Sequence, residues 1–178
     1  DASMIGVRVV GGEGSTVGSV AYGGDGVYNV RYTVLASGEY HISAVVGGNA
    51  HIVNSPFSVE VSAAEASAGH SRASGDGLSA GTAGVESVFA VDVRDAYGNA
   101  ANAPAGVLPP SVTVSMGDDV ASVANVTAVG GYGNEFFVEY IATVSGEYSV
   151  GVFVGGVNVS GSPFESVVVA GAASAGAS

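Results

Sequence analysis

Residues 145–164 read SGEYSVGVFVGGVNVSGSPF, and residues 37–57 read SGEYHISAVVGGNAHIVNSPF. Tyr40 returns as Tyr148, 108 positions later, while the shared Ser-Pro-Phe ending returns after 107, so one residue is lost following the paired glycines. A repeat of roughly a hundred residues is too long for a solenoid unit and fits a whole β-sandwich domain. The sequence therefore predicts a piece of a tandem domain array.

Both copies alternate apolar and polar residues with a period of two. The segments 28–32 and 136–140, which precede them, alternate in the same phase. Because successive side chains of a strand point to opposite faces of a sheet, this pattern predicts half-buried strands. Turn residues, among them Asn99 and Pro109-Pro110, separate the strand-length runs. The predicted fold class is all-β, with tandem immunoglobulin-like sandwiches.

The charge of the chain excludes some partners. Lysine is absent, and four arginines face 16 acidic residues, which gives a net charge of −12. Such a surface repels nucleic acid and anionic membranes. Cysteine is absent, which excludes a disulfide framework, thiolate catalysis and cysteine-bound zinc. An acidic surface suits an extracellular or cell-surface fibre, which we favour over a cytoskeletal or ciliary setting, but a compositional bias of the genome would produce it too.

One segment carries the order of motifs of a known family. It begins near Ala64, has GDGL at 75–78 and VFAVDVRDAYGN at 88–99, and ends with GSPF at 161–164. This order resembles the filamin-type immunoglobulin repeat. The resemblance implies a Greek-key sandwich of strands A to G, with A, B, E and D in one sheet and C, F and G in the other. It predicts a complete repeat at 63–169, and a linker or the start of a further repeat at 170–178.

The resemblance makes residues 1–62 the C-terminal part of another repeat, strands C to G. Its first strand would lie at Met4 to Val10, and nothing in the sequence before it could form strands A and B. The face that carries Tyr28, Val30 and Tyr32 would then lack a covering strand. Each large side chain left in water would forfeit about 1.5–3 kcal/mol of burial free energy. We expect residues upstream of Asp1, or strands from another chain, to complete this unit.

Three local features give further expectations. Proline lacks an N–H and can begin an edge strand, so Phe57 and Phe164 are expected to enter the cores directly after it. Strict alternation after Phe164 would bury Ser166, which predicts a bulge or a shift of phase there. Residues 62–74, SAAEASAGHSRAS, are small and polar and predict an exposed linker.

A strand edge is the predicted binding site. In filamin-like repeats a partner peptide can pair along strand C and pack between strands C and D, which is β-augmentation. Strand C would be Ser111, Val112, Thr113, Val114 and Ser115, and strand D roughly 121–129. Strand C follows two prolines and carries no charge, so it lacks the usual protection of an edge. The alternative is an edge covered by a neighbouring domain. The equivalent edge of the first unit would be 6–10.

Metal and catalytic sites have little support in the sequence. The three histidines, His41, His51 and His70, lack ligand spacing and are expected to be solvated surface residues. Calcium could be held by carboxylates such as Asp92, Asp95 and Asp118-Asp119, but no Asp-x-Asp-x-Asp loop is present. Asp95 is better explained as a cap of its own turn, residues 95–99. No serine is paired with a plausible base, so no catalytic site, cofactor or metal is predicted.

Two sequons, at Asn125 and Asn158, are possible glycosylation sites, although one or two would arise by chance in a chain rich in serine and threonine. Asn158 is the better candidate because it should lie in an exposed loop.

The leading functional hypothesis is a non-enzymatic structural protein, part of a rod, fibre or scaffold, that associates with itself or with neighbouring strands through strand edges. The alternatives are a peptide-binding module of a cytoskeletal or ciliary protein and a cell-surface adhesion domain.

Overall fold

The computed structural model describes residues 5–12, 14–101, 109–117, 119–122, 125–129 and 134–172. It divides into two compact units, Asp1–Ala63 (unit 1) and Ala64–Ser178 (unit 2). The regular elements of the described residues are strands and one short 3₁₀ helix, η2 (Asp76–Leu78), so the predicted all-β fold class is confirmed. Within these ranges, no helix has the length and apolarity required to cross a membrane.

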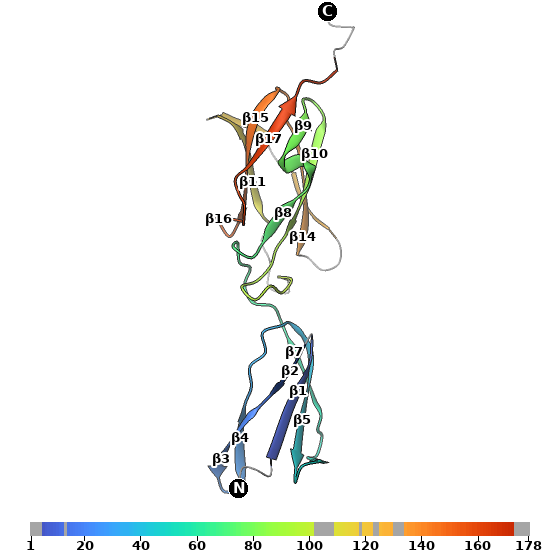
Figure 1. Cartoon of the computed structure of the whole chain (residues 1–178), viewed down its shortest axis with the longest axis vertical. Coiled ribbons are helices and arrows are strands. Elements are labelled where there is room, and N and C mark those ends of the chain that lie inside the picture. The colour runs from blue at the N-terminus through green and yellow to red at the C-terminus, as the bar shows by residue number, and fades with distance from the viewer. Residues whose placement is uncertain are drawn as a thin grey trace, which may run out of the picture. The chain divides into compact units, whose positions relative to one another are not determined.

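Unit 2 is a sandwich of two sheets, visible as two layers in Figure 1. The first sheet has the order β13 (Asn125–Val129), β14 (Glu135–Ile141), β10 (Glu86–Asp92) and β8 (Arg72–Ser74). The second has the order β12 (Asp119–Ser122), β11 (Ser111–Met116), β15 (Gly146–Val154), β17 (Phe164–Val169) and β9 (Ala80–Thr82), and β16 (Val157–Asn158) also pairs with β15. All pairs are antiparallel except that of β17 with β9. The two layers match the A-B-E-D and C-F-G sheets that the resemblance implies.

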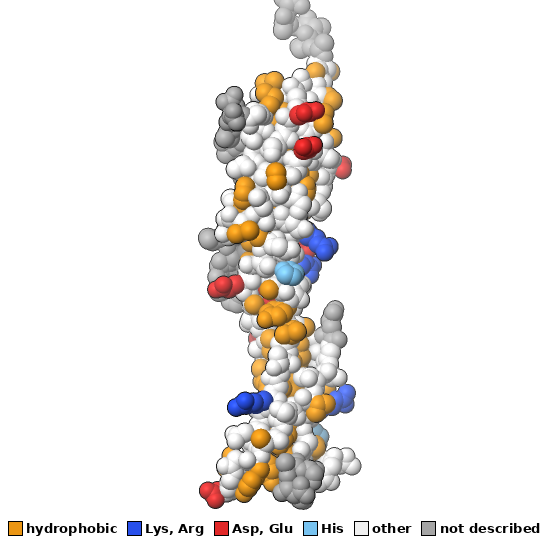
Figure 2. Space-filling view, turned by 60° about the vertical axis from the view of Figure 1, so that its left-hand side comes forward, with side chains coloured by type: hydrophobic (Ala, Val, Ile, Leu, Met, Phe, Trp, Pro, Cys, Tyr) orange, Lys and Arg blue, Asp and Glu red, His pale blue; other side chains and the backbone are white. Residues whose placement is uncertain are grey.

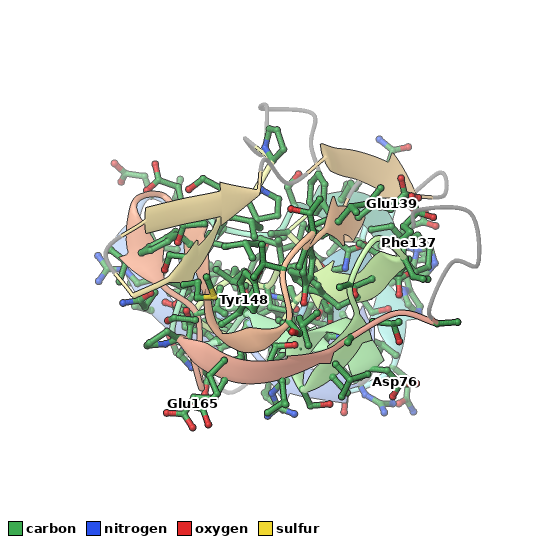
Figure 3. The ribbon with its side chains drawn as sticks, turned by 90° about the horizontal axis from the view of Figure 1, so that it is seen from above. Asp76, Phe137, Glu139, Tyr148 and Glu165 are labelled. Carbon is green, nitrogen blue, oxygen red and sulfur yellow. The ribbon has the colours of Figure 1, made fainter. Side chains whose placement is uncertain are left out.

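The core of unit 2 lies between these layers because each strand turns alternate residues inward. Its largest buried side chains come from both sheets: Phe89, Val91, Val93, Val114, Phe136, Val138, Tyr140, Tyr148, Val150 and Val152. Viewed from above in Figure 3, Tyr148 lies among the side chains between the layers, whereas Glu165 and Asp76 lie on the outside. The period-two pattern of the sequence thus identified the inward faces correctly.

Unit 1 contains fewer strands. One sheet has the order β2 (Gly14–Val17), β1 (Ile5–Gly11), β5 (Gly38–Val46) and β6 (Ala50–His51), with β7 (Phe57–Val61) also paired to β5. The other is a two-stranded hairpin of β3 (Ser19–Gly24) and β4 (Val27–Arg31). In unit 1, β1, β5 and β7 pair as β11, β15 and β17 do in unit 2.

The repeated motif makes the same hydrogen bonds in both units. The hydroxyl of Tyr40 donates to the carbonyl oxygen of Ala36 at 2.8 Å, and that of Tyr148 donates to Val144 at 2.7 Å. This is the tyrosine corner of immunoglobulin-like sandwiches. Each Ser-Pro-Phe serine likewise accepts a hydrogen bond from the preceding long strand. Ser55 Oγ lies 2.9 Å from the backbone nitrogen of Ala44, and Ser162 Oγ lies 2.9 Å from that of Val152.

The expected bulge at Ser166 is wrong. β17 pairs with β15 without a shift of register, and Ser166, opposite Tyr148, is fully buried. The hydroxyl of Ser166 lies 3.3 Å from that of Tyr140 and 3.4 Å from the carbonyl oxygen of Gly77. A buried hydroxyl that has partners carries little penalty, so the alternation continues through a polar residue.

The expected linker at 62–74 is also wrong for most of its length. Ala66 forms a β-bridge with Asp95. Both Ala68 and Ser71 are buried. Residues 72–74 form β8, which pairs with β10. The Ser71 hydroxyl accepts a hydrogen bond from the backbone of Arg94 at 3.1 Å. Small residues suit residues 66–71 because this segment contacts the chain directly after β10, at Arg94 and Asp95.

The two anchoring phenylalanines differ. Phe164 packs against the core of unit 2 and is half-buried. Phe57 keeps 39% of its surface exposed, so its predicted burial is wrong. Within the described part of unit 1, the second sheet consists of β3 and β4, and it offers less surface to cover this ring.

Candidate strand-edge site

The predicted edge strand exists as β11, and its side chains alternate. Val114 is fully buried, Val112 and Ser115 are half-buried, and Ser111 and Thr113 are exposed. The inner edge of β11 pairs with β15 from Ser111 to Ser115. The binding question therefore concerns the outer edge, where a further strand could be added.

The predicted strand D, 121–129, is divided between the two sheets. Its beginning belongs to β12, which pairs with β11 at Val114, Ser115 and Met116. Its end is β13, which pairs with β14 in the opposite sheet. The chain therefore changes sheets within this segment and covers the C-terminal half of the β11 edge. Among the described residues, no strand pairs with the outer edge of 111–113.

Val112 directs its backbone groups toward this open edge. It lies opposite Val152 on β15. The N–H of Val152 donates to Ser162 Oγ, and its carbonyl oxygen accepts from Val159 at 3.0 Å, so both groups face away from β11. Opposed residues of an antiparallel pair either exchange both hydrogen bonds or point both away from each other. The N–H and C=O of Val112 consequently point outward.

The equivalent edge of unit 1, residues 6–10, is more completely covered. β2 pairs with β1 from Arg8 to Gly11. The carbonyl oxygen of Val7 accepts a hydrogen bond from Gly18 at 3.1 Å. Less of this strand is left for a partner than in unit 2.

A second open edge lies on β4 of unit 1. In unit 2 the corresponding strand, β14, is paired on both sides, by β10 and β13. Within the described part of unit 1, β4 pairs with β3 alone. Val138 and Tyr140 are 0% and 2% exposed, whereas their counterparts Val30 and Tyr32 are 38% and 39% exposed. Among the described residues, these two apolar side chains of unit 1 are therefore more exposed than their counterparts in unit 2.

Asp95 organises a turn, as predicted. Its Oδ1 accepts from the backbone of Tyr97 at 2.8 Å and of Asn99 at 2.9 Å, and its Oδ2 accepts from Asn99 Nδ2 and the backbone of Ala64. Burial raises the pKa of this carboxyl, but the hydrogen bonds from Asn99, Ala64 and Tyr97 outweigh it and hold the pKa below its ordinary value. A carboxylate occupied by four donors has no oxygen free for calcium.

The other polar candidates lie apart. His41, His51 and His70 are exposed, and each ring meets a serine hydroxyl, those of Ser58, Ser55 and Ser67 respectively. No group of three potential metal ligands occurs among the residues that the structure describes. Asp118 lies outside the described residues, and Asp119 begins β12.

The two sequons fall on strands. Asn125 begins β13. Asn158 is exposed on β16 rather than in the open loop that was expected, and its side-chain oxygen accepts a hydrogen bond from Ser162 at 3.0 Å.

Sequence comparison identifies the family. The model of the Filamin/ABP280 repeat matches residues 65–165. Filamin-C of Rattus norvegicus is 32% identical over 143 residues, which are 79% of this chain and 5% of that protein. The chain thus spans a small part of this relative's length.

Solved structures show the same fold in bacterial proteins. InvD of Yersinia pseudotuberculosis matches with a TM-score of 0.61 and 18% identity, over 98% of this chain and 49% of that one. FdeC, an Escherichia coli adhesin, matches with a TM-score of 0.58 and 20% identity, over 88% of this chain and 48% of that one. The family match covers more than half of the sequence, and the chain therefore belongs to the Filamin/ABP280 repeat family.

Proposed function

We propose that this chain is a structural segment, part of a rod, fibre or scaffold, that joins protein neighbours by adding strands at exposed sheet edges. The observation that supports this most directly is the outward N–H and C=O of Val112, at an edge without charge. Main-chain hydrogen bonds to an added strand supply affinity in this mode, and side-chain pockets supply specificity. Ser111, Val112 and Thr113 form the part of the edge that β12 leaves uncovered. Val114 and Ser115 pair with β12 and would join this edge if a partner strand displaced β12.

The test compares two variants at one position. Val112→Pro removes the outward N–H together with part of the apolar side chain, whereas Val112→Ala removes side chain and keeps the N–H. Sedimentation equilibrium of the 178-residue chain should show concentration-dependent association that Val112→Pro weakens more than Val112→Ala does. Amide spectra should confirm that both variants fold. A chain that stays monomeric, or equal association by both variants, would refute pairing at this edge.

We further propose that unit 1 consists of strands C to G of a repeat whose cover is supplied by a strand pair resembling β8 and β10. The support is internal to the chain, because β10 covers the strand of unit 2 that corresponds to β4. Where β10 pairs with β14, Phe89 lies opposite Val138, and Val91 lies opposite Phe136. A strand with large apolar residues at alternate positions fits the face of Val30 and Tyr32 in the same way.

This completion can be tested by adding a copy of residues 64–101 ahead of Asp1. We expect slower hydrogen exchange at the amides of residues 27–31 and protection of Tyr32 from chemical modification. A matched fusion in which the copies of Phe89 and Val91 are serine should give neither effect. Equal exchange in both fusions would contradict the proposal for unit 1 and leave the proposal for Val112 unaffected.

A further inference from the structure

The cationic side chains of unit 2 gather in one place. Unit 2 has eleven acidic residues, two arginines and one histidine. Arg72, Arg94 and His70 all line one open hollow of about 390 Å³, together with Gly69, Asp92, Gly98 and Ser160. Figure 2 shows blue arginine side chains beside a pale blue histidine on this unit. In so acidic a molecule, a hollow lined by every basic residue of its unit calls for a specific explanation.

The pairing of β8 with β10 brings these residues together. Arg72 lies directly opposite Asp92, so their side chains share the outer face of the sheet. Arg94 follows two positions after Asp92, and the buried Val93 between them faces the core. A bridge between Arg72 and Ser160 places the other wall of the hollow beside this face.

The two arginines differ in what they already bind. Arg94 Nε donates to Asp92 Oδ2 at 2.7 Å, and its Nη1 donates to the carbonyl oxygen of Gly98 at 2.8 Å. Asp92 is occupied further by Asn134 Nδ2 at 3.0 Å. Within the described residues, Arg72 has no carboxylate within ion-pair distance. One guanidinium is thus fixed in place by its neighbours, and the second is available to a ligand.

The donors of the hollow suit an oxyanion. The planar fork of Arg72 can bind the two oxygens of a carboxylate together. The remaining N–H groups of Arg94 and the hydroxyl of Ser160 add donors around it, and His70 adds one when its second ring nitrogen carries a proton. The single carboxylate of the hollow, Asp92, is already neutralised by Arg94. The hollow therefore keeps one uncompensated positive charge, that of Arg72.

The charge of the whole chain restricts which anion can enter. At a net charge of −12, a polymer with closely spaced charges is repelled by the surrounding surface. A single carboxylate on a segment of low charge meets the hollow without that cost. We propose that this hollow docks one Asp or Glu side chain of a partner protein. The site is separate from the edge at Val112, so either can fail alone.

The test follows the side-chain Nε–Hε signals of the arginines in the 178-residue chain by NMR. The probes are a short peptide with blocked ends and one internal glutamate, and the same peptide with glutamine. We expect the glutamate peptide to shift the Arg72 and Arg94 signals to saturation, with binding that weakens as salt is added. The glutamine peptide should shift neither.

Two variants locate the site. Arg72→Gln should lower the association constant of the glutamate peptide about tenfold, the value of one bidentate charge-assisted contact. The matched control, Arg8→Gln, removes the same charge from unit 1 and should leave binding unchanged. Absence of saturable shifts, equal shifts from both peptides, or an equal loss in the two variants would overturn the proposal. Tighter binding of inorganic sulfate, or of a peptide offering only a C-terminal carboxylate, would overturn the choice of an acidic side chain.

Discussion

The hydroxyl of Tyr140 donates a hydrogen bond to the carbonyl oxygen of Gly77, a residue 63 positions earlier in the chain. Tyr140 lies on β14 in one sheet and is 2% exposed, and Gly77 lies in η2, the short helical turn before β9. Ser166 of β17, in the other sheet, approaches the same oxygen. This buried contact therefore links η2 to both layers of the sandwich.

Tyr140→Phe should destabilise unit 2 by about 1–3 kcal/mol, because it leaves the buried carbonyl of Gly77 without its principal donor. Ser166→Ala should cost about 1 kcal/mol or less, since its hydrogen bonds are long and Tyr140 still satisfies that carbonyl. Urea denaturation followed by the amide signals of unit 2 measures both values. A larger loss in Ser166→Ala than in Tyr140→Phe would contradict this assignment of the donor.

Gly77→Ala should also destabilise unit 2, by about 1–3 kcal/mol, through overpacking. A Cβ at this position would lie 2.8 Å from the carbonyl oxygen of Val88, which is backbone and has little freedom to move. Gly69→Ala is the matched control, because a Cβ there meets nothing within 4 Å. The urea midpoint of Gly77→Ala should lie clearly below that of Gly69→Ala. Equal midpoints would show that the backbone near Val88 can move to accommodate the Cβ.

The elements that the sequence predicted well depend on local information. Period-two alternation placed Tyr148, Val150 and Val152 correctly in the core, because which face a side chain takes follows from its position along one strand. The repeat strengthened the prediction of strands, since the same apolar and polar positions occur in both copies of the motif.

What the sequence could not predict depends on contacts between distant residues. Ser166 is buried because its partners, Tyr140 and Gly77, lie 26 and 89 positions away, and no local pattern records them. Residues 62–74 have the composition of a linker, but the hydroxyl of Ser71 is fixed by Arg94, 23 positions later. The hollow at Arg72 and Arg94 was missed for the same reason: two isolated arginines form no motif until β8 pairs with β10.

The acid stability of unit 2 should depend on Asp95. A carboxyl whose pKa is lower in the folded than in the unfolded chain stabilises the fold above the unfolded value, about 3.9. That contribution is lost as the pH falls through the lower, folded value. Asp95→Asn should cost about 3 kcal/mol at neutral pH, because backbone N–H groups lose a charged acceptor. The stability of the wild-type unit should therefore fall more steeply than that of the variant below about pH 4, which denaturation at several pH values would measure.

The serines of the Ser-Pro-Phe motif allow the two units to be compared directly. Ser162 accepts the N–H of Val152, which is fully buried, and Ser55 accepts that of Ala44, which is half-buried. Ser162→Ala should therefore destabilise unit 2 by about 1–3 kcal/mol, the cost of a buried donor without a partner. Ser55→Ala should cost unit 1 less, because water can reach the freed N–H of Ala44.

Amide exchange during urea titration measures the loss of stability of unit 1 and that of unit 2 separately. Ser149→Ala, at an exposed position on β15, is the control for loss of a hydroxyl and should leave both units unchanged. Equal losses from Ser162→Ala and Ser55→Ala would show that burial does not set the value of this bond. The Ser-Pro-Phe motif would then stabilise unit 2 no more than it stabilises unit 1.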